Sequence, residues 1–347
     1  MYLFDVSIPI SHSSILPCFQ VLAELESQKY TIVEWRISIY GRKASEWATL
    51  AQWFYQHRLA HKNVRWLVQV PRLYHVYKSA QQITCFGDML RNIFAPLFEA
   101  TLGSAPTDPA LEYFLGAVVG FDSVDDESIP EMELLHARMP APEAYTEPHN
   151  PPYAYWMYYM YANICVLNQQ RAQRGLNTFA FRPHGGEAGD VDHLISTFLL
   201  AHHVNHGILL RKQASLQYLY YLSQIGVAVS PLCNSKIFLD CKRNPFNKFF
   251  QVGMNVSLST DGPLMLHFSK DALLEEYGTA SQMWNLKSVD LCEIARSSVL
   301  QSGVELEQKK VFLGPHLNDP RCSNVPEIRL VYRQEVLQGE LDLLRIE

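Results

Sequence analysis

Phe179 to Gly189 reads FAFRPHGGEAG, and this stretch decides the fold that we expect. The short apolar run at residues 177–181 is typical of a strand, and the proline and glycines that follow it end the strand. His184 and Glu187 therefore stand three residues apart at a strand end, where α/β enzymes carry their catalytic groups. A buried histidine beside a solvated glutamate at an ordinary strand end remains the alternative, since short motifs are not specific.

Two further stretches favour a catalytic interpretation. Residues 254–263 read MNVSLSTDGP, in which apolar and polar residues alternate as in a strand that ends at Asp261. Residues 204–207 read VNHG and end in the same way at His206. If the three strands belong to one parallel barrel, their end residues face one mouth. Two histidines and an aspartate, with a glutamate nearby, are the side chains of a zinc hydrolase or deaminase.

Strand and helix patterns alternate along the chain, which predicts an α/β fold with a parallel sheet. We expect strands near residues 37, 66, 119, 180, 205, 228 and 257. A (β/α)8 barrel of the TIM type has eight strands, so the expected barrel lacks its first strand. The patterns also predict an acidic turn at residues 122–127, a helix at 192–203 and a capping box formed by Asp290 and Glu293. Residues 1–20 form an atypical segment, and residues 21–347 form the barrel domain.

Composition excludes several protein classes. Hydrophobic residues are 48% and charged residues 18% of the chain, which predicts a globular protein. The net charge of −6 argues against a nucleic-acid or membrane-surface binder, and no apolar stretch is long enough to span a membrane. The first ten residues contain no Lys or Arg, unlike a signal peptide. The seven cysteines form no CxxC pair, which indicates reduced thiols in the cytosol. We interpret Cys233 and Cys241 as small core residues.

The sequence resembles the AMP deaminase family of the adenosine deaminase superfamily. The resemblance extends from about Val21 to the C-terminus. It rests on several long segments in the same order, namely RISIYGR, VQVPRLY, GFDSVDDES, YYMYANICVLN, FRPHGGEAG, HGILL, SPLCNSKIFL, SLSTDGPLMLHFSKDALLEEY and CEIARSSVLQSG.

The resemblance implies hydrolysis of AMP to IMP and ammonia with one zinc ion per subunit. It implies that His184 and Asp261 are zinc ligands, that Glu187 donates a proton to the purine and that His206 accepts a proton from water. The implied substrate-binding residues are Glu187, Asp261, Gly262, Pro263 and Leu264. The family also suggests a cytosolic homo-oligomer with AMP as its substrate and no nucleic-acid or membrane partner.

This chain departs from the family in three ways. In the family, a His-x-His pair on the first strand supplies two zinc ligands, and this chain contains no such pair. The chain also lacks the family's upstream lysine-bearing substrate segment. Gly262 stands where the family has an aspartate that contacts the purine. One hypothesis is therefore a fragment or truncated gene model of an active deaminase. A second is a catalytically impaired pseudoenzyme that assembles with active AMP deaminase subunits, and a minor third is a different hydrolase on the same barrel.

Other basic and imidazole side chains have simpler interpretations. Three arginines near strand ends are candidates for phosphate contact, although surface or outer-layer arginines are commoner; they are Arg36, Arg42 and Arg72. We place three histidines on a helix and assign them no catalytic or metal-binding role, namely His193, His202 and His203. His267 is expected to support the site rather than to bind metal.

Overall fold

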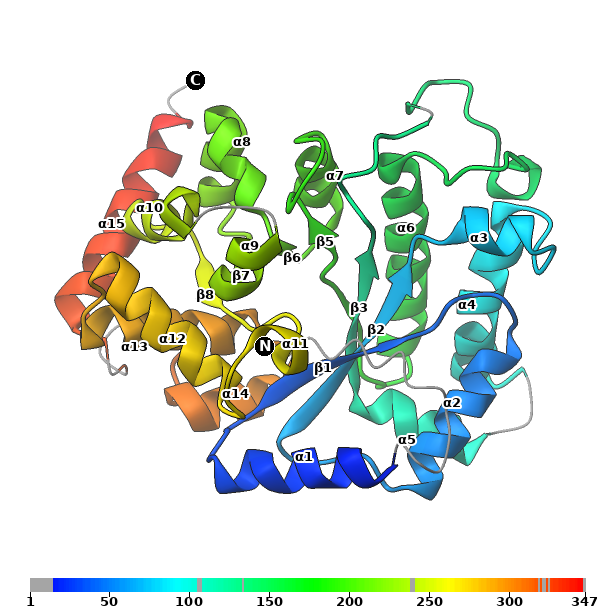
Figure 1. The fold of residues 1–347 in the computed structure, drawn as a ribbon, viewed down its shortest axis with the longest axis horizontal. Coiled ribbons are helices and arrows are strands. Elements are labelled where there is room, and N and C mark those ends of the chain that lie inside the picture. The colour runs from blue at the N-terminus through cyan, green and yellow to red at the C-terminus, as the bar shows by residue number, and fades with distance from the viewer. Residues whose placement is uncertain are drawn as a thin grey trace. The chain divides into compact units, whose positions relative to one another are not determined.

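The computed structural model describes residues 15–104, 108–132, 134–237, 241–317 and 325–345, together with residues 319 and 323. The chain divides into two compact units. The described part of the N-terminal unit runs to His184 and includes Leu199–Ala201, whereas the C-terminal unit contains Gly185–Phe198 and the described residues from His202 onward. Figure 1 labels the helices and strands of both.

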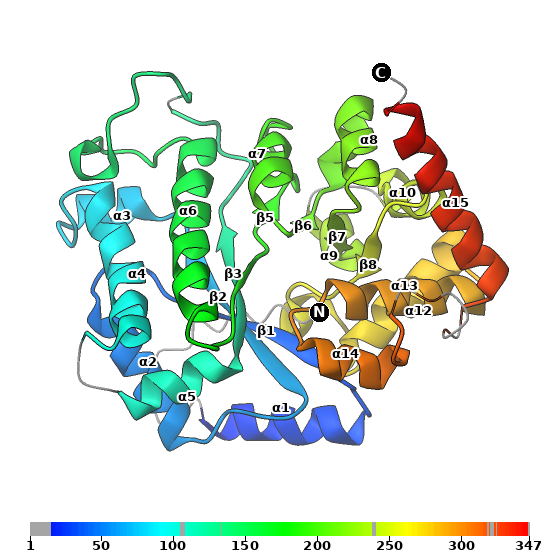
Figure 2. The same cartoon turned by 180° about the vertical axis from the view of Figure 1, so that it is seen from behind.

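The N-terminal unit is built on a four-stranded parallel sheet of order β1-β2-β3-β4. Its strands are β1 (Val33–Ser38), β2 (Val64–Pro71), β3 (Val118–Val124) and β4 (Ala180–Phe181). Its helices are α1 (Ile15–Ser27), α2 (Ser45–Gln56), α3 (Tyr74–Ser79), α4 (Phe86–Leu102), α5 (Pro109–Ala117), the 3-10 turn η2 (Pro142–Ala144) and α6 (Tyr153–Ala172). Figures 1 and 2 show α2, α4 and α6 on the same side of β1–β3.

Burial on both faces explains the apolar runs of these strands. In β2 every residue except Arg65 and Pro71 is buried, as expected when both faces of a parallel sheet are covered. Aromatic side chains fill the space under the helices. Phe54 of α2 packs against Phe114 of α5 with ring centroids 4.9 Å apart, and the indole of Trp47 donates to the carbonyl of Ile93 at 2.8 Å.

The C-terminal unit carries a second four-stranded sheet, of order β5-β6-β7-β8, in which β6 to β8 are parallel. Its strands are β5 (His184–Gly185, at the junction of the units), β6 (His203–His206), β7 (Gly226–Val229) and β8 (Val256–Leu258). Its helices are α7 (His193–Leu200), η3 (Ile208–Lys212), α8 (Ala214–Leu222), α9 (Pro231–Ile237), η4 (Cys241–Arg243), α10 (Phe246–Gln251), α11 (Pro263–Leu266), α12 (Ala272–Trp284), α13 (Ser288–Gln301), α14 (Leu306–Leu313) and α15 (Glu327–Leu343).

The core of this unit lies between its sheet and its helices. Val227, Val229 and Phe249 are fully buried in one apolar cluster. Figures 1 and 2 show α8, α10 and α15 side by side. Arg333 of α15 fastens α15 to α10, because its guanidinium donates to the carbonyls of Phe250 and Gln251 at 2.8 and 3.0 Å.

The structure confirms the α/β class with parallel strands. All seven predicted strand positions coincide with strands, and the one near residue 180 is divided at Arg182–Pro183 into β4 and β5. Closure into one barrel, and the division into residues 1–20 and 21–347, stay predictions; residues 1–14 lie outside the described part. Among the described residues, no helix has the length and apolarity needed to cross a bilayer.

Several local predictions are wrong. Asp122 lies inside β3, not in a turn, because β3 pairs Asp122 with Gln69 of β2. His203 lies in β6 rather than on a helix, and its Nδ1 accepts the backbone N–H of Gly226 at 3.0 Å. Asp290 does not begin a capping box with Glu293; its carboxylate accepts the backbone N–H of Lys287 at 2.6 Å, one turn into α13.

Candidate functional site

In the N-terminal unit, the predicted zinc ligand His184 is held by a buried carboxylate. Its Nδ1 atom lies 2.9 Å from Oδ1 of Asp122, and the Asp122 side chain is fully buried. Asp122 also accepts from the Arg36 guanidinium at 2.6 Å and from the Gln69 amide at 3.1 Å. Burial opposes ionisation of this carboxyl, but the charges of His184 and Arg36 outweigh it and lower the pKa of Asp122 to about 2. Asp122 is therefore an anion that orients the imidazole.

All three arginines predicted as phosphate candidates pair with carboxylates. Arg36 is fully buried against Asp122, and Arg72 is 5% exposed and pairs with Asp125 and Glu131. Arg42 is 40% exposed and pairs with Glu46 at 2.7 Å. Arg36 and Arg72 are therefore buried structural arginines and not the surface or outer-layer arginines of the commoner expectation.

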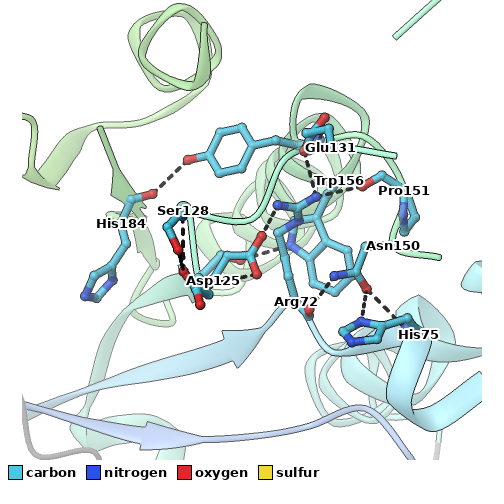
Figure 3. A network of polar contacts seen from close by, with 12 residues as sticks. Arg72, His75, Asp125, Ser128, Glu131, Asn150, Pro151, Trp156 and His184 are labelled. Atoms are coloured by element: carbon cyan, nitrogen blue, oxygen red, sulfur yellow. Dashed lines mark hydrogen bonds and ion pairs between the residues drawn. The ribbon is translucent and has the colours of Figure 1, made fainter. Parts of the chain in front are cut away.

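Arg72 also fixes the long proline-rich loop that precedes α6. Figure 3 shows its guanidinium among Asp125, Glu131 and Pro151, where it bonds Glu131 at 3.0 Å and the Pro151 carbonyl at 2.8 Å. Glu131 in turn accepts the backbone N–H of Tyr153, the first residue of α6, at 2.7 Å. The Tyr153 hydroxyl donates to the carbonyl of His184 at 2.7 Å. The loop, α6 and the backbone of His184 thus form one continuous polar network.

In the C-terminal unit, Glu187 and His206 lie in direct contact. Nδ1 of His206 is 3.3 Å from Oε1 of Glu187, and His206 is only 1% exposed. Nδ2 of Asn234 donates to Oε1 of Glu187 at 2.9 Å and lies 3.2 Å from Nδ1 of His206. Asn234 was not predicted from the sequence. Its position at the first turns of α9, directly after β7, is the signal that would have identified it.

Backbone conformation at the end of β6 sets the direction of His206. This residue has a φ of 71°, a left-handed conformation that is unusual for a residue with a side chain. The next turn is held by the backbone N–H of Gly207, which donates to the carbonyl of Gly185 at 2.9 Å. Gly186 has no room for a side chain, because a Cβ atom would lie 2.6 Å from Leu194. Strained backbone of this kind collects at functional sites.

Asp261 follows β8 and meets a thiol. Its Oδ2 atom lies 2.6 Å from Sγ of Cys233 on α9. Burial raises the pKa of the Cys233 thiol, and the Asp261 carboxylate raises it further. Cys233 is fully buried, as predicted for a core residue, but it touches a predicted metal ligand. Among the described side chains, Cys85, Cys165, Cys233 and Cys292 form no disulfide; the Cys241 side chain lies outside the described part.

The remaining predicted residues lie next to Asp261. Gly262 precedes α11 with a φ of −101°, and Pro263 begins that helix. Leu264 belongs to α11 as well, but its side chain lies outside the described part. His267 does not join Asp261; it forms a fully buried pair with Glu276 at 3.1 Å, and Glu276 also accepts the backbone N–H of Leu232 in α9.

Possible metal ligands gather within the C-terminal unit. Ligand atoms of His206 and Asp261 lie within 4.8 Å of each other, and the same limit holds among Glu187, Cys233 and Asp261. Imidazole, carboxylate and thiol are the ligand types of zinc sites. In the N-terminal unit, His184 Nδ1 contacts the Asp122 carboxylate, an arrangement that metal-binding histidines commonly show.

Comparison of the sequence with known proteins identifies a family that it matches. A model of the family described as AMP deaminase matches residues 16–347. AMP deaminase 3 of Rattus norvegicus is 51% identical over 333 residues, which are 94% of this chain and 43% of that protein. AMP deaminase of Saccharomyces cerevisiae is 49% identical over 332 residues, which are 94% of this chain and 41% of that protein. This chain thus spans about two fifths of the length of these curated relatives.

Solved structures share the fold. An adenine deaminase from Arthrobacter aurescens superposes with a TM-score of 0.53 at 14% identity, over 85% of this chain and 76% of that one. An amidohydrolase from Burkhoderia ambifaria with bound Zn superposes with a TM-score of 0.55 at 12% identity, over 94% of this chain and 75% of that one. At these identities the similarity establishes the fold alone.

Proposed function

The chain belongs to the AMP deaminase family, and from this premise we propose that it hydrolyses AMP to IMP and ammonia. Relatives about half identical over 94% of the chain are AMP deaminases, which favours catalysis over the role of an impaired partner subunit. The single observation that carries the proposal is the buried contact between Glu187 and His206, joined by the amide of Asn234. This contact places two proton-transfer groups at the ends of neighbouring strands.

Deamination of adenine requires water at C6 and a proton at ring nitrogen N1. We assign the proton at N1 to the Glu187 carboxyl group. Its Oε1 atom accepts from the Asn234 amide at 2.9 Å, which holds the carboxyl group beside His206. General acids placed in this way typically contribute about 10²–10⁴-fold to a rate.

His206 is the proposed base for the attacking water. If its Nδ1–H donates to Oε1 of Glu187, at 3.3 Å, then Nε2 is the unprotonated nitrogen. The contact thereby fixes the tautomer that can take a proton from water.

The family resemblance implies one zinc ion per subunit, and we propose Asp261 and His184 as two of its ligands on that ground. The Asp122 carboxylate would orient the His184 imidazole, as carboxylates do behind metal-binding histidines. When bound, zinc would supply a hydroxide nucleophile at neutral pH, because it lowers the pKa of water to about 7. Gly262, Pro263 and Leu264 are the proposed substrate contacts beside Asp261.

Three finer properties belong to the same proposal. We propose AMP rather than adenosine as substrate, a homo-oligomeric state and a cytosolic location, on the strength of the family resemblance. The free cysteines of the described part are consistent with a reducing compartment.

Product analysis tests the proposed function. The purified 347-residue chain is incubated with zinc and either AMP or adenosine, and the nucleotide products are separated by chromatography. We expect equimolar IMP and ammonia from AMP, with slower turnover of adenosine. Absence of IMP from a folded, zinc-loaded sample would contradict the proposal. Co-purification of an inactive chain with an active AMP deaminase would favour the partner-subunit hypothesis.

A further inference from the structure

Cys233 has a contact that the proposed reaction does not explain. Its Sγ atom lies 2.6 Å from Oδ2 of Asp261, the proposed metal ligand. The thiol is fully buried, and it stands in the first half of α9, one residue before Asn234. The same short helix therefore carries a thiol that faces Asp261 and an amide that holds Glu187 and His206.

The groups around this thiol are all potential metal ligands. Sγ of Cys233 and carboxylate oxygens of Glu187 and Asp261 lie within 4.8 Å of one another. A ring nitrogen of His206 lies within the same distance of Asp261. A thiol that only fills a core has mainly apolar neighbours, whereas this buried sulfur lies beside two carboxylates, one of which is also close to an imidazole nitrogen.

We propose that Sγ of Cys233 is a direct ligand, next to Asp261, of a zinc-type divalent cation. The inference rests on the proposed metal-dependent reaction and adds a ligand to its site. Sulfur, oxygen and nitrogen donors together are typical of zinc. Two ligands of one tetrahedral zinc are roughly 3.6 Å apart, given bond lengths of about 2.3 Å to sulfur and 2.1 Å to oxygen. An ion would thus replace the thiol hydrogen and separate the pair by about 1 Å.

The competing explanation is a hydrogen bond alone. In that case the Cys233 S–H group only donates to the Asp261 carboxylate and holds it in place. A serine would serve equally well, because its hydroxyl is a better donor. The two explanations differ in whether sulfur is bonded to the metal, and cobalt spectroscopy reads that bond directly.

The experiment uses the full chain, freed of metal and titrated with Co²⁺ without added thiols. Wild type is compared with Cys233→Ser and with Cys85→Ser, a matched control that removes another buried thiol. We expect a near-ultraviolet sulfur-to-cobalt charge-transfer band in wild type and in Cys85→Ser, and no such band in Cys233→Ser. The affinity of Cys233→Ser for Co²⁺ should fall by at least the roughly 10–100-fold that loss of a supporting group costs.

Zinc K-edge X-ray absorption of the wild-type protein gives a readout that does not depend on a variant folding. One sulfur neighbour per zinc is expected. Cobalt or zinc that binds without sulfur, or a band that persists in Cys233→Ser, overturns the inference and leaves the proposed deaminase standing. No metal binding at all overturns both. A sulfur band in a protein that does not turn over AMP keeps the ligand and rejects the proposed function.

Discussion

The Nδ1 atom of His184 lies 2.9 Å from Oδ1 of Asp122, although 62 residues separate them in the chain. Parallel pairing brings them together, because β3 carries Asp122 into the sheet and its neighbour β4 ends at Phe181, three residues before His184. Arg36 and Gln69, from β1 and β2, complete the hydrogen bonds of the carboxylate. Four consecutive strand regions therefore share one buried charged group.

Replacement of Asp122 by asparagine should weaken both stability and metal binding. Asparagine keeps the shape but removes the charge, so the buried Arg36 loses the carboxylate to which it donates. Loss of one partner of a buried ion pair costs about 3–5 kcal/mol, and loss of a carboxylate behind a metal ligand costs about 10–100-fold in affinity. Urea unfolding and zinc titration measure the two effects. Asp126→Asn, on the exposed loop nearby, is the control and should change neither appreciably.

Low pH should remove the stabilisation that the ionised Asp122 carboxylate provides. The pKa of Asp122 falls from an ordinary 3.8 to about 2 in the folded protein. A carboxyl with a lowered folded pKa stabilises the protein above its unfolded pKa and loses that contribution as the pH falls through the folded value. The contribution is about 2 kcal/mol. Between about pH 4 and pH 2, the free energy of unfolding should therefore decrease more steeply for wild type than for Asp122→Asn; equal slopes would contradict the assignment.

Replacement of Arg72 by lysine should loosen the proline-rich loop. Lysine keeps the charge but cannot reach Asp125, Glu131 and the Pro151 carbonyl together, because an ammonium lacks the planar fork of arginine. We expect a loss of about 1–3 kcal/mol and faster proteolysis within residues 125–152. Arg91→Lys alters an exposed pair with Asp88 and should cost less than about 1 kcal/mol. Equal effects of the two variants would show that the network does not hold the loop.

Replacement of Gly262 by aspartate should improve AMP turnover. The backbone there has a φ of −101°, which any residue adopts, and a new Cβ atom would meet Met265 at an ordinary 3.4 Å. The family resemblance places a purine-binding aspartate at this position, and one substrate hydrogen bond contributes about 1–3 kcal/mol. We expect kcat/KM to rise by roughly 5–100-fold. A decrease, with the stability unchanged, would show that the purine does not lie beside α11.

Strand positions were predictable from the sequence because burial leaves a direct local pattern. The apolar β2 and the alternating residues before Asp261 both end at prolines or glycines, and these ends place His184, Glu187, His206 and Asp261 correctly at strand ends. Three of the short helices were not predicted. Helices α3, α5 and α9 are six to nine residues long, which is too short for a clear apolar period.

Contacts between side chains on different strands and helices could not be predicted from the sequence either. Asp122 stands in an acidic segment that resembles an exposed turn, and only its register with Gln69 makes it a buried anion. Asn234 and Cys233 belong to a segment without apolar periodicity, and their contacts depend on strands β5, β6 and β8 meeting α9. Such contacts join residues far apart in the chain and leave no local pattern.

The central claim is that Glu187 and His206 carry the proton transfers of AMP hydrolysis. The most direct test is ammonia release from AMP by the zinc-supplemented chain and by Glu187→Gln, which keeps the size of the side chain but cannot donate a carboxyl proton. The account predicts measurable turnover for the wild type and a decrease in kcat of about 10²–10⁴-fold for the variant, with the fold and the bound zinc retained. Equal rates for the two proteins would contradict the assignment of Glu187 as the proton donor.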